Sequence, residues 1–212
     1  MINRSTSISR RELLKCAAAG AVAAGLPGIS TWAQAARPAR PGIALQLYSI
    51  RKDCAQDFDQ ALEAVAKMGF EAVEFAGYHS YGDNPQGLRE RLDDLGLKVA
   101  GTHIGTDRLV GDALPKTVEF HQVIGCQYLI VPGDGRFSDP EKSKELAEIF
   151  NEAARRLKPQ GMYTGYHNHT HEFEKDGDKT YWELFAERTT PDVVLQQDVG
   201  WTTAAGVDPV AM

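Results

Sequence analysis

The sequence predicts an α/β protein built on a parallel sheet, and two repeated observations support that prediction. Four times, a polar segment with helical periodicity ends at a glycine, and a short apolar run follows it. The glycines are Gly69, Gly96, Gly125 and Gly161, each suited to the left-handed position that ends a helix. Short apolar runs separated by helical segments favour parallel strands joined by right-handed crossovers.

Six strands can be placed along the chain. They are predicted at residues 42–49, 70–75, 97–103, 128–132, 162–169 and 192–200. Apolar stripes at helical spacing precede the second and fifth strands and comprise Phe58, Leu62, Val65 and Ala66, then Leu146, Ile149, Phe150, Ala153 and Leu157. Tyr48, Phe75 and Tyr166 are predicted core residues, whereas His121 is predicted on the surface of a helix.

The position of polar side chains within these strands distinguishes between two possible folds. Six alternating units suit either an open doubly wound sheet or part of an eight-fold barrel. The sequence has no Gly-x-Gly-x-x-Gly turn after the first strand, which weakens the dinucleotide-binding form of the open sheet. Six polar residues fall late in their strands, namely Gln46, Glu74, His103, His167, His169 and Asp198. Because the carboxyl ends of barrel strands converge on one face, this placement favours the barrel.

The N-terminal residues have the pattern of an export signal. Residues 9–15, SRRELLK, form a twin-arginine pattern, and a weakly apolar, Ala-rich run covers residues 16–29. Ala33-Gln34-Ala35 then supplies a small-x-small cleavage site. We predict a signal peptide over residues 1–35, a Pro-rich linker over 36–41 and the folded domain over 42–212. The predicted location is periplasmic or secreted, with no membrane anchor after cleavage.

The net charge limits the classes of binding partner, and the cysteine positions bear on disulfide formation. The chain carries 23 basic and 29 acidic side chains; the predicted signal holds four basic and one acidic, so the remainder has a net charge of −9. An acidic surface of this kind repels nucleic acid and anionic membranes. Cys54 is predicted in a loop and Cys126 at the start of a strand, positions that give no reason to expect a disulfide.

The stretch YHNHTHEFE, residues 166–174, places three histidines at alternate positions beside two glutamates. Because side chains alternate across a strand, His167 and His169 should share a face, and Asp198 ends the neighbouring strand. Imidazole with carboxylate is a common ligand set for Zn, Mn, Fe or Co. A single histidine at a strand end is more often a hydrogen-bonded surface residue, but two on one face opposite an aspartate favour a metal site.

Several motifs, in their order and spacing, resemble one known family. They are QLYS in the first strand, GFEAVEF in the second, GTHIG in the third, YHNHTHEF in the fifth and DVGW in the sixth. From Gly42 to the last residue the chain is similar to the xylose isomerase-like TIM-barrel superfamily, and within it to exported, twin-arginine members of the sugar phosphate isomerase/epimerase group. The resemblance implies a (β/α)8 TIM barrel with about six of its eight βα units in this chain.

The resemblance also implies one divalent metal ion (Mn, Mg, Co or Zn) at the carboxyl face of the barrel. Family members typically take its ligands from strands five to eight, as Glu, Asp, His and Glu. Asp198 falls on the strand-six aspartate, and His167 falls where many members carry the strand-five glutamate. The last two ligands have no counterpart before Met212, so the chain is expected to be C-terminally truncated.

The implied activity is isomerisation or epimerisation of a sugar, by proton transfer next to a carbonyl through a metal-stabilised enediolate. The predicted catalytic residues are His167, Glu172 and His103. Glu172 would be a displaced base, the alternative being a solvated loop residue. The predicted substrate-binding residues are Gln46, Glu74, His169 and Trp201. The expected partner is a small-molecule sugar or sugar derivative, and a homo-oligomer is compatible with the sequence.

Other interpretations stay open. A lyase or hydratase acting on oxidised sugars or glycosides would begin with a related enolate. A non-catalytic sugar-binding barrel is consistent with His167 in place of glutamate. A phosphodiester-cleaving repair enzyme is opposed by the acidic charge and the export signal. An amidohydrolase is opposed by the first strand, LQLYS, where its His-x-His pair would normally lie.

Overall fold

The computed structural model describes residues 42–211, and in that range six parallel strands form one sheet. The strands are β1 (Ala44–Gln46), β2 (Ala72–Phe75), β3 (Lys98–His103), β4 (Tyr128–Val131), β5 (Tyr163–His167) and β8 (Val193–Gln196). Their order in the sheet, β1-β2-β3-β4-β5-β8, follows the chain. Consecutive barrel units have this order, whereas a doubly wound sheet reverses direction at a switch point. The predicted barrel topology is therefore confirmed over these six strands.

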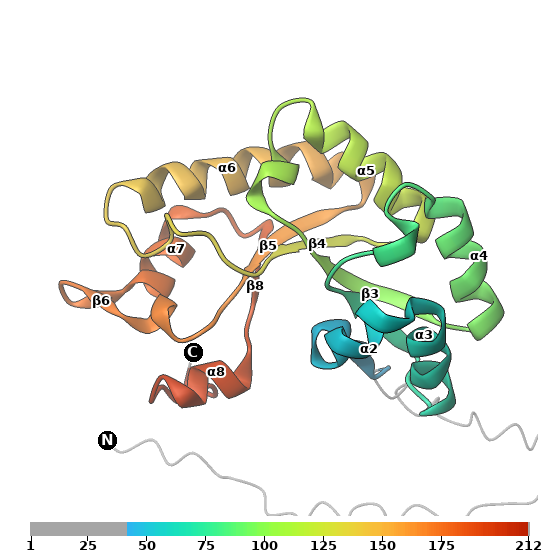
Figure 1. Cartoon of the computed structure of the whole chain (residues 1–212). Helices are drawn as coiled ribbons and strands as arrows, with labels where there is room; N and C mark the ends of the chain where they lie inside the picture. The colour runs from blue at the N-terminus through green and yellow to red at the C-terminus, as the bar shows by residue number, and fades with distance from the viewer. Residues whose placement is uncertain (1–41, 212) are drawn as a thin grey trace, which may run out of the picture. The chain divides into compact units, whose positions relative to one another are not determined.

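Helices follow the strands, and α4, α5 and α6 form an arc over one side of the sheet (Figure 1). They are α2 (Arg51–Gln56), α3 (Phe58–Lys67), α4 (Pro85–Leu95), α5 (Ala113–Ile124), α6 (Lys142–Leu157), α7 (Tyr181–Arg188) and α8 (Val199–Ala204). As predicted, Gly96 and Gly125 end α4 and α5 in the left-handed region, at φ of 67° and 75°. Gly161 does the same after a short 3-10 turn, Lys158–Gln160.

The hydrophobic core lies between the sheet and these helices. Val73 and Phe75 of β2 are fully buried in a cluster with Leu62 of α3. A second cluster surrounds Tyr166 of β5; its aromatic neighbours are Phe137, Phe150 and Phe185. The predictions for Phe75 and Tyr166 are confirmed. Because strand side chains alternate, Glu74, between Val73 and Phe75, lies on the opposite face of the sheet.

The first strand is shorter than predicted. It ends at Gln46, because Leu47–Ile50 forms a 3-10 helix, η1, whose first turn is capped by the Gln46 side chain: Oε1 accepts a hydrogen bond from Tyr48 N at 2.6 Å. Tyr48 was predicted in the core, and that prediction is wrong, since the residue is 60% exposed. Its ring instead lies under the guanidinium of Arg51, at 4.5 Å.

The last two strands also end early. β5 stops at His167 and β8 at Gln196, so His169 and Asp198 belong to the segments that follow their strands. After β5 the chain forms a 3-10 turn, His171–Phe173, and a two-stranded hairpin that the sequence did not predict. The hairpin strands are β6 (Lys175–Asp176) and β7 (Lys179–Thr180).

His121 of α5 is buried, with 3% of its surface exposed, so its predicted surface position is wrong. Its Nδ1 lies 2.5 Å from the carbonyl oxygen of Thr117, and its Nε2 lies 2.6 Å from the hydroxyl of Tyr78. Tyr78 in turn contacts Thr102 Oγ1 at 2.6 Å. Burial lowers the pKa of His121 to about 4, so the imidazole is neutral at physiological pH.

The predicted signal peptide and linker, residues 1–41, lie outside the described residues, as does Met212. Within residues 42–211, none of the helices has both the length and the apolar character needed to cross a bilayer. Cys54 lies in α2 rather than in a loop, and Cys126 precedes β4. Both thiols are free and buried, and burial raises the pKa of each, that of Cys126 to about 12.

Candidate active site

A cavity of about 650 Å³ opens at the carboxyl ends of the strands. Its lining residues are Gln46, Tyr48, Ser49, Ala76, His103, Ile104, Gly105, Pro132, Gly133, His167, His169, Asp198 and Trp201. Six of the eight site residues predicted from the sequence are in this set; Glu74 and Glu172 are not. The size is in the range of sites for small molecules, which is about 300–1,000 Å³.

Five side chains from five strands form one hydrogen-bonded set, here called the polar layer: Gln46, Glu74, His103, His167 and Gln196. The strand register brings them together, because Gln46 pairs with Glu74 across β1 and β2, and His167 pairs with Gln196 across β5 and β8. Since the strands are parallel, side chains at matched positions project from the same face.

Glu74 is the central acceptor of the polar layer. Gln196 Nε2 donates to its Oε1 at 2.6 Å, and Gln46 Nε2 donates to its Oε2 at 3.3 Å. His103 Nε2 lies 3.6 Å from the same carboxylate. The Glu74 side chain is 13% exposed and is not among the residues that line the cavity, and its carboxylate orients the neighbouring amides.

His167 and Asp198 face each other on the cavity wall. His167 Nε2 lies 3.8 Å from Asp198 Oδ2, with the two side chains 12% and 33% exposed. The backbone around Asp198 fixes this arrangement. Its Oδ1 accepts from Trp201 N at 2.8 Å as the N-cap of α8, and its own N donates to Asn168 Oδ1 at 2.7 Å. The other carboxylate oxygen, Oδ2, faces His167.

The pKa of His167 is lowered from its ordinary value, first because burial disfavours the charged ring. The neighbouring rings of His103, at a centroid distance of 4.9 Å, and His169, at 5.2 Å, act in the same direction. The hydrogen bond to Gln196 and the charge of Asp198 oppose the change. A neutral imidazole has a lone pair available for a cation or a proton.

The donor atoms fit a divalent cation in part. Two ligands of one tetrahedral zinc ion lie about 3.4 Å apart, from bond lengths of about 2.1 Å, so His167 Nε2 and Asp198 Oδ2 are close to bridging distance. Across residues 42–211, however, no group of three or more His, Cys, Asp or Glu side chains is arranged to hold a metal. The described residues therefore offer two ligands, which is fewer than a protein metal site normally uses.

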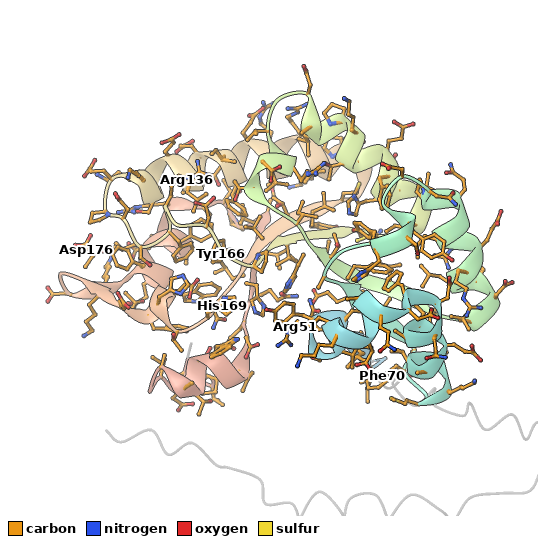
Figure 2. The ribbon with its side chains drawn as sticks, in the orientation of Figure 1. Arg51, Phe70, Arg136, Tyr166, His169 and Asp176 are labelled. Atoms are coloured by element: carbon orange, nitrogen blue, oxygen red, sulfur yellow. The ribbon has the colours of Figure 1, made fainter. Side chains whose placement is uncertain are left out.

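His169 and Trp201 form another part of the wall. Their rings lie 5.4 Å apart, and Trp201 is 45% exposed. Figure 2 marks His169, which follows β5, and Tyr166, which lies within it. An exposed indole beside polar groups presents an aromatic face with hydrogen-bonding neighbours, an arrangement suited to a sugar ring.

Glu172 is fully buried, so the alternative of a solvated loop acid is wrong. Its Oε2 accepts from His169 N at 2.8 Å. Its Oε1 has no hydrogen-bond partner among the described residues and lies 3.0 Å from His171 Nε2. This carboxylate lies outside the cavity lining and holds the backbone of His169, and its predicted catalytic role stays a prediction.

Comparison with known proteins agrees with this geometry. The family model described as "Xylose isomerase-like TIM barrel" matches residues 62–212. The chain belongs to this family. The resemblance predicted from the sequence, and the (β/α)8 fold that it implied, are thereby confirmed. None of the curated proteins matches the chain.

Several solved structures are similar to this xylose isomerase-like barrel. A sugar phosphate isomerase/epimerase from Parabacteroides distasonis is 28% identical with a TM-score of 0.65, over 82% of this chain and 72% of that one. A second protein of that name and organism is 29% identical with a TM-score of 0.67, over 80% and 73%. The probable 3-DHS dehydratase AsbF of Bacillus anthracis, 15% identical with a TM-score of 0.60 over 80% and 67%, shares the fold alone.

Two residues of this family member were not assigned a role from the sequence. Gln196 joins three other side chains of the polar layer through its amide, and Asn168, fully buried, links the end of β5 to Asp198. The signal for Gln196 was its place two residues before Asp198, on the same face of a strand. No comparable signal marked Asn168, since its partners are backbone and hydroxyl groups distant in sequence.

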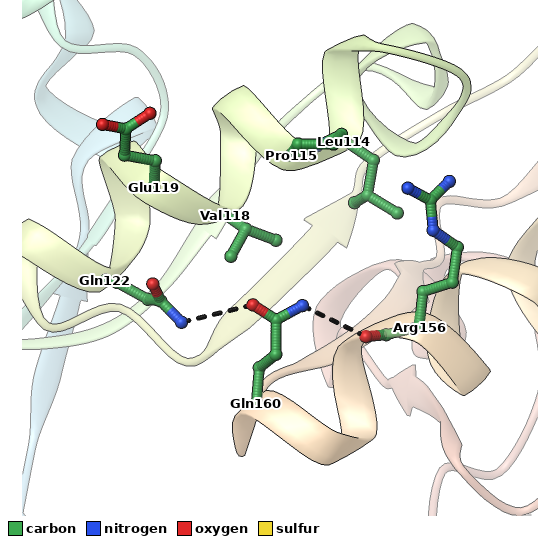
Figure 3. A pocket seen from close by; sticks show the side chains of 7 residues that line it. All are labelled: Leu114, Pro115, Val118, Glu119, Gln122, Arg156 and Gln160. Atoms are coloured by element: carbon green, nitrogen blue, oxygen red, sulfur yellow. Dashed lines mark hydrogen bonds between the residues drawn. The ribbon is translucent and has the colours of Figure 1, made fainter.

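A smaller hollow of about 340 Å³ lies between α5 and the end of α6 in this barrel (Figure 3). Leu114 and Val118 supply apolar surface, and Gln160 bridges the two elements through Gln122 Nε2 and the carbonyl oxygen of Arg156. It contains none of the predicted site residues. The cavity at the strand ends is therefore the candidate active site.

Proposed function

We propose that this chain is a sugar isomerase or epimerase that moves a proton next to a carbonyl, with one divalent cation held in part by His167 and Asp198. The observation that carries the proposal is the contact of 3.8 Å between His167 Nε2 and Asp198 Oδ2 on the wall of the cavity. Family membership and the two Parabacteroides neighbours support the same class of reaction.

The cavity lining explains how a sugar would be held. Trp201 would pack on the C–H face of the ring, while Gln46 and His169 would bond hydroxyl groups. Export would separate the protein from intracellular phosphorylated metabolites, so an unphosphorylated sugar or an oxidised sugar is the substrate class proposed here.

Imidazoles are the candidate proton carriers. Of the residues that line the cavity, Asp198 is the only acidic one, and one of its oxygens is engaged at the start of α8. His169 lines the cavity and is the candidate for accepting the proton. Of the two histidines predicted as catalytic from the sequence, His103 has hydrogen-bond partners on both ring nitrogens, and His167 would hold the cation through Nε2. A divalent cation at His167 and Asp198 would supply stabilisation of negative charge on the neighbouring substrate oxygens.

The test is proton exchange measured by NMR. The purified full chain is analysed for bound metal and incubated in D2O with a panel of aldoses, ketoses and keto-sugars. We expect deuterium at the carbon next to the carbonyl, together with the isomerised or epimerised product. Loss of water or of an aglycone with a new conjugated absorbance would assign a lyase instead. Binding of a sugar without exchange would assign a non-catalytic barrel.

The variants His167→Ala and Asp198→Ala test the site itself. Each is expected to lose bound metal and exchange activity, because each removes one of the two facing donors. His79→Asn is the matched control: His79 is exposed, lies outside the cavity lining and has a positive φ of 46°, which asparagine tolerates. Unchanged metal content in both alanine variants would remove the ligand assignment.

We also propose that the protein is exported by the twin-arginine route, on the basis of SRRELLK and the Ala33-Gln34-Ala35 site. N-terminal sequencing of the protein from its native host should begin at Ala36. Replacing Arg10 and Arg11 by lysine should leave the precursor inside the cell. A mature protein that retains Met1 would contradict this proposal.

A further inference from the structure

Gln196 is the one side chain of the polar layer that contacts both histidines of that layer and the glutamate. Its Nε2 lies 2.6 Å from Glu74 Oε1. Its Oε1 lies 3.1 Å from His103 Nε2 and 2.9 Å from His167 Nδ1. It is not among the residues that line the cavity, whereas both histidines that it contacts are.

Glu74 determines which way the Gln196 amide faces. A carboxylate accepts hydrogen bonds and donates none, so the atom 2.6 Å from it must be the amide nitrogen. The reversed amide would place two oxygen atoms in contact with no proton between them. The amide oxygen of Gln196 therefore faces the two imidazoles.

An amide oxygen can only accept, and this fixes which ring nitrogen of each histidine carries the proton. His167 must donate from Nδ1, which leaves the lone pair on Nε2, the atom 3.8 Å from Asp198 Oδ2. His103 must donate from Nε2, which leaves Nδ1 to accept from Gln46 Nε2 at 3.2 Å. Gln46 is held in that orientation in turn, because its Oε1 accepts from Tyr48 N. Each donor in the polar layer thus faces an acceptor.

We propose that Gln196 is a positioning residue that selects the Nδ1–H tautomer of His167 and so directs the Nε2 lone pair into the cavity toward Asp198. The inference about the tautomer stands on the hydrogen bonds alone. Its use in holding a cation rests on the proposed function, since a second-shell acceptor on Nδ1 is the usual means of presenting Nε2 to a metal.

The experiment reads the tautomer directly. The full chain, labelled with ¹⁵N and prepared without metal, is studied at alkaline pH, where the rings are neutral, by long-range ¹H–¹⁵N correlation. We expect His167 with the proton on Nδ1 in the unmodified protein. In Gln196→Leu the Nδ1–H form should lose its dominance, because the acceptor is gone. The double variant Glu74→Gln/Gln196→Glu exchanges donor and acceptor between these two positions, keeps an acceptor for both rings and should restore the Nδ1–H form.

Gln197→Leu is the matched control. It removes the same amide one position along, where the side chain donates to the carbonyl oxygen of Pro209 rather than to the polar layer, so the His167 tautomer should not change. Retention of the Nδ1–H form in a folded Gln196→Leu variant would overturn the proposal, as would an Nε2–H form in the unmodified protein.

A second measurement separates this inference from the proposed function. Titration with Co²⁺ should show affinity reduced about 10–100-fold in Gln196→Leu, the usual cost of losing a second-shell partner, and unchanged in Gln197→Leu. A tautomer change without any Co²⁺ binding in the unmodified protein would leave the role of Gln196 intact and remove the cation from the proposed function.

Discussion

His121 is buried and His167 is largely buried, and burial lowers the pKa of both imidazoles, yet their surroundings differ in one respect. Both ring nitrogens of His121 have partners, Tyr78 and Thr117, inside the core. His167 has a hydrogen-bond partner on one nitrogen, Gln196, and the other nitrogen faces Asp198 across 3.8 Å at a cavity. The comparison teaches that burial alone does not mark a functional histidine. The feature on which the proposed role of His167 rests is its second nitrogen, which faces an acid at a cavity.

The largest expected effect is on activity at His167. In His167→Gln, we expect the rate of proton exchange to fall by about 10³-fold, because the variant loses one of the two facing donor atoms of the proposed cation site. The free energy of unfolding should change by less than about 1 kcal/mol, since glutamine still has a polar group to meet Gln196. Exchange NMR and urea unfolding measure the two quantities. Equal rates of proton exchange in the variant and the unmodified protein would contradict the proposed role of His167.

The second effect is on stability at His121. His121→Ala should lower the free energy of unfolding by about 3 kcal/mol, because it leaves a cavity in the core and the Tyr78 hydroxyl without that partner. Exchange activity per folded molecule should stay within about twofold. Tyr78→Phe and the double variant complete a cycle, and we expect clear coupling between the two sites. A stability loss confined to a few tenths of a kcal/mol would contradict the core role.

The third effect is a pH dependence of stability. The folded pKa of His121 is about 4, below the ordinary value of 6.5, so the unfolded chain takes up this proton first as the pH falls. Stability from this group is present above pH 6.5 and is lost as the pH falls toward 4, by at most about 3 kcal/mol at 1.36 kcal/mol per pH unit. Urea unfolding across this range should show a shallower acid loss in His121→Gln. Parallel curves would exclude the buried neutral ring.

The smallest effect is expected at Trp201. Trp201→Ala should change the free energy of unfolding by about 0.5 kcal/mol or less, because the side chain is 45% exposed. Sugar affinity should weaken by about fivefold to tenfold through loss of the aromatic face. Intrinsic fluorescence and isothermal titration calorimetry measure these changes. Trp201→Phe is the control that keeps an aromatic face, and affinity equal to that of Trp201→Ala would argue against ring packing.

Much of the fold was predictable because local sequence patterns, such as helix-ending glycines and apolar stripes, agree with the structure that forms. Glycines in the left-handed region end α4 and α5, and the buried stripe from Phe58 to Val65 faces the sheet. The meeting of six of the eight predicted site residues at one cavity was also predictable, since parallel strands bring their carboxyl ends to one edge. That rule alone brought His103, His167 and Asp198 to one cavity.

The remainder depended on contacts that no local pattern encodes. The first strand ends early because the Gln46 side chain caps a 3-10 turn, which competes with continued strand pairing. Burial of His121 depends on Tyr78, 43 residues away in sequence. The roles of Glu172 and Gln196 follow from where their carboxylate and amide atoms reach. Such side-chain directions are set by packing, which sequence periodicity does not describe.

Asp198 joins the start of α8 to the cavity through its two oxygens, one bound to Trp201 N and the other toward His167. The helix cap and the proposed chemistry therefore use separate atoms of one carboxyl group. An amide in its place would keep an acceptor for the helix while removing the charge. Asp198→Asn is thus the substitution expected to remove the proposed activity without loosening the segment that carries Trp201.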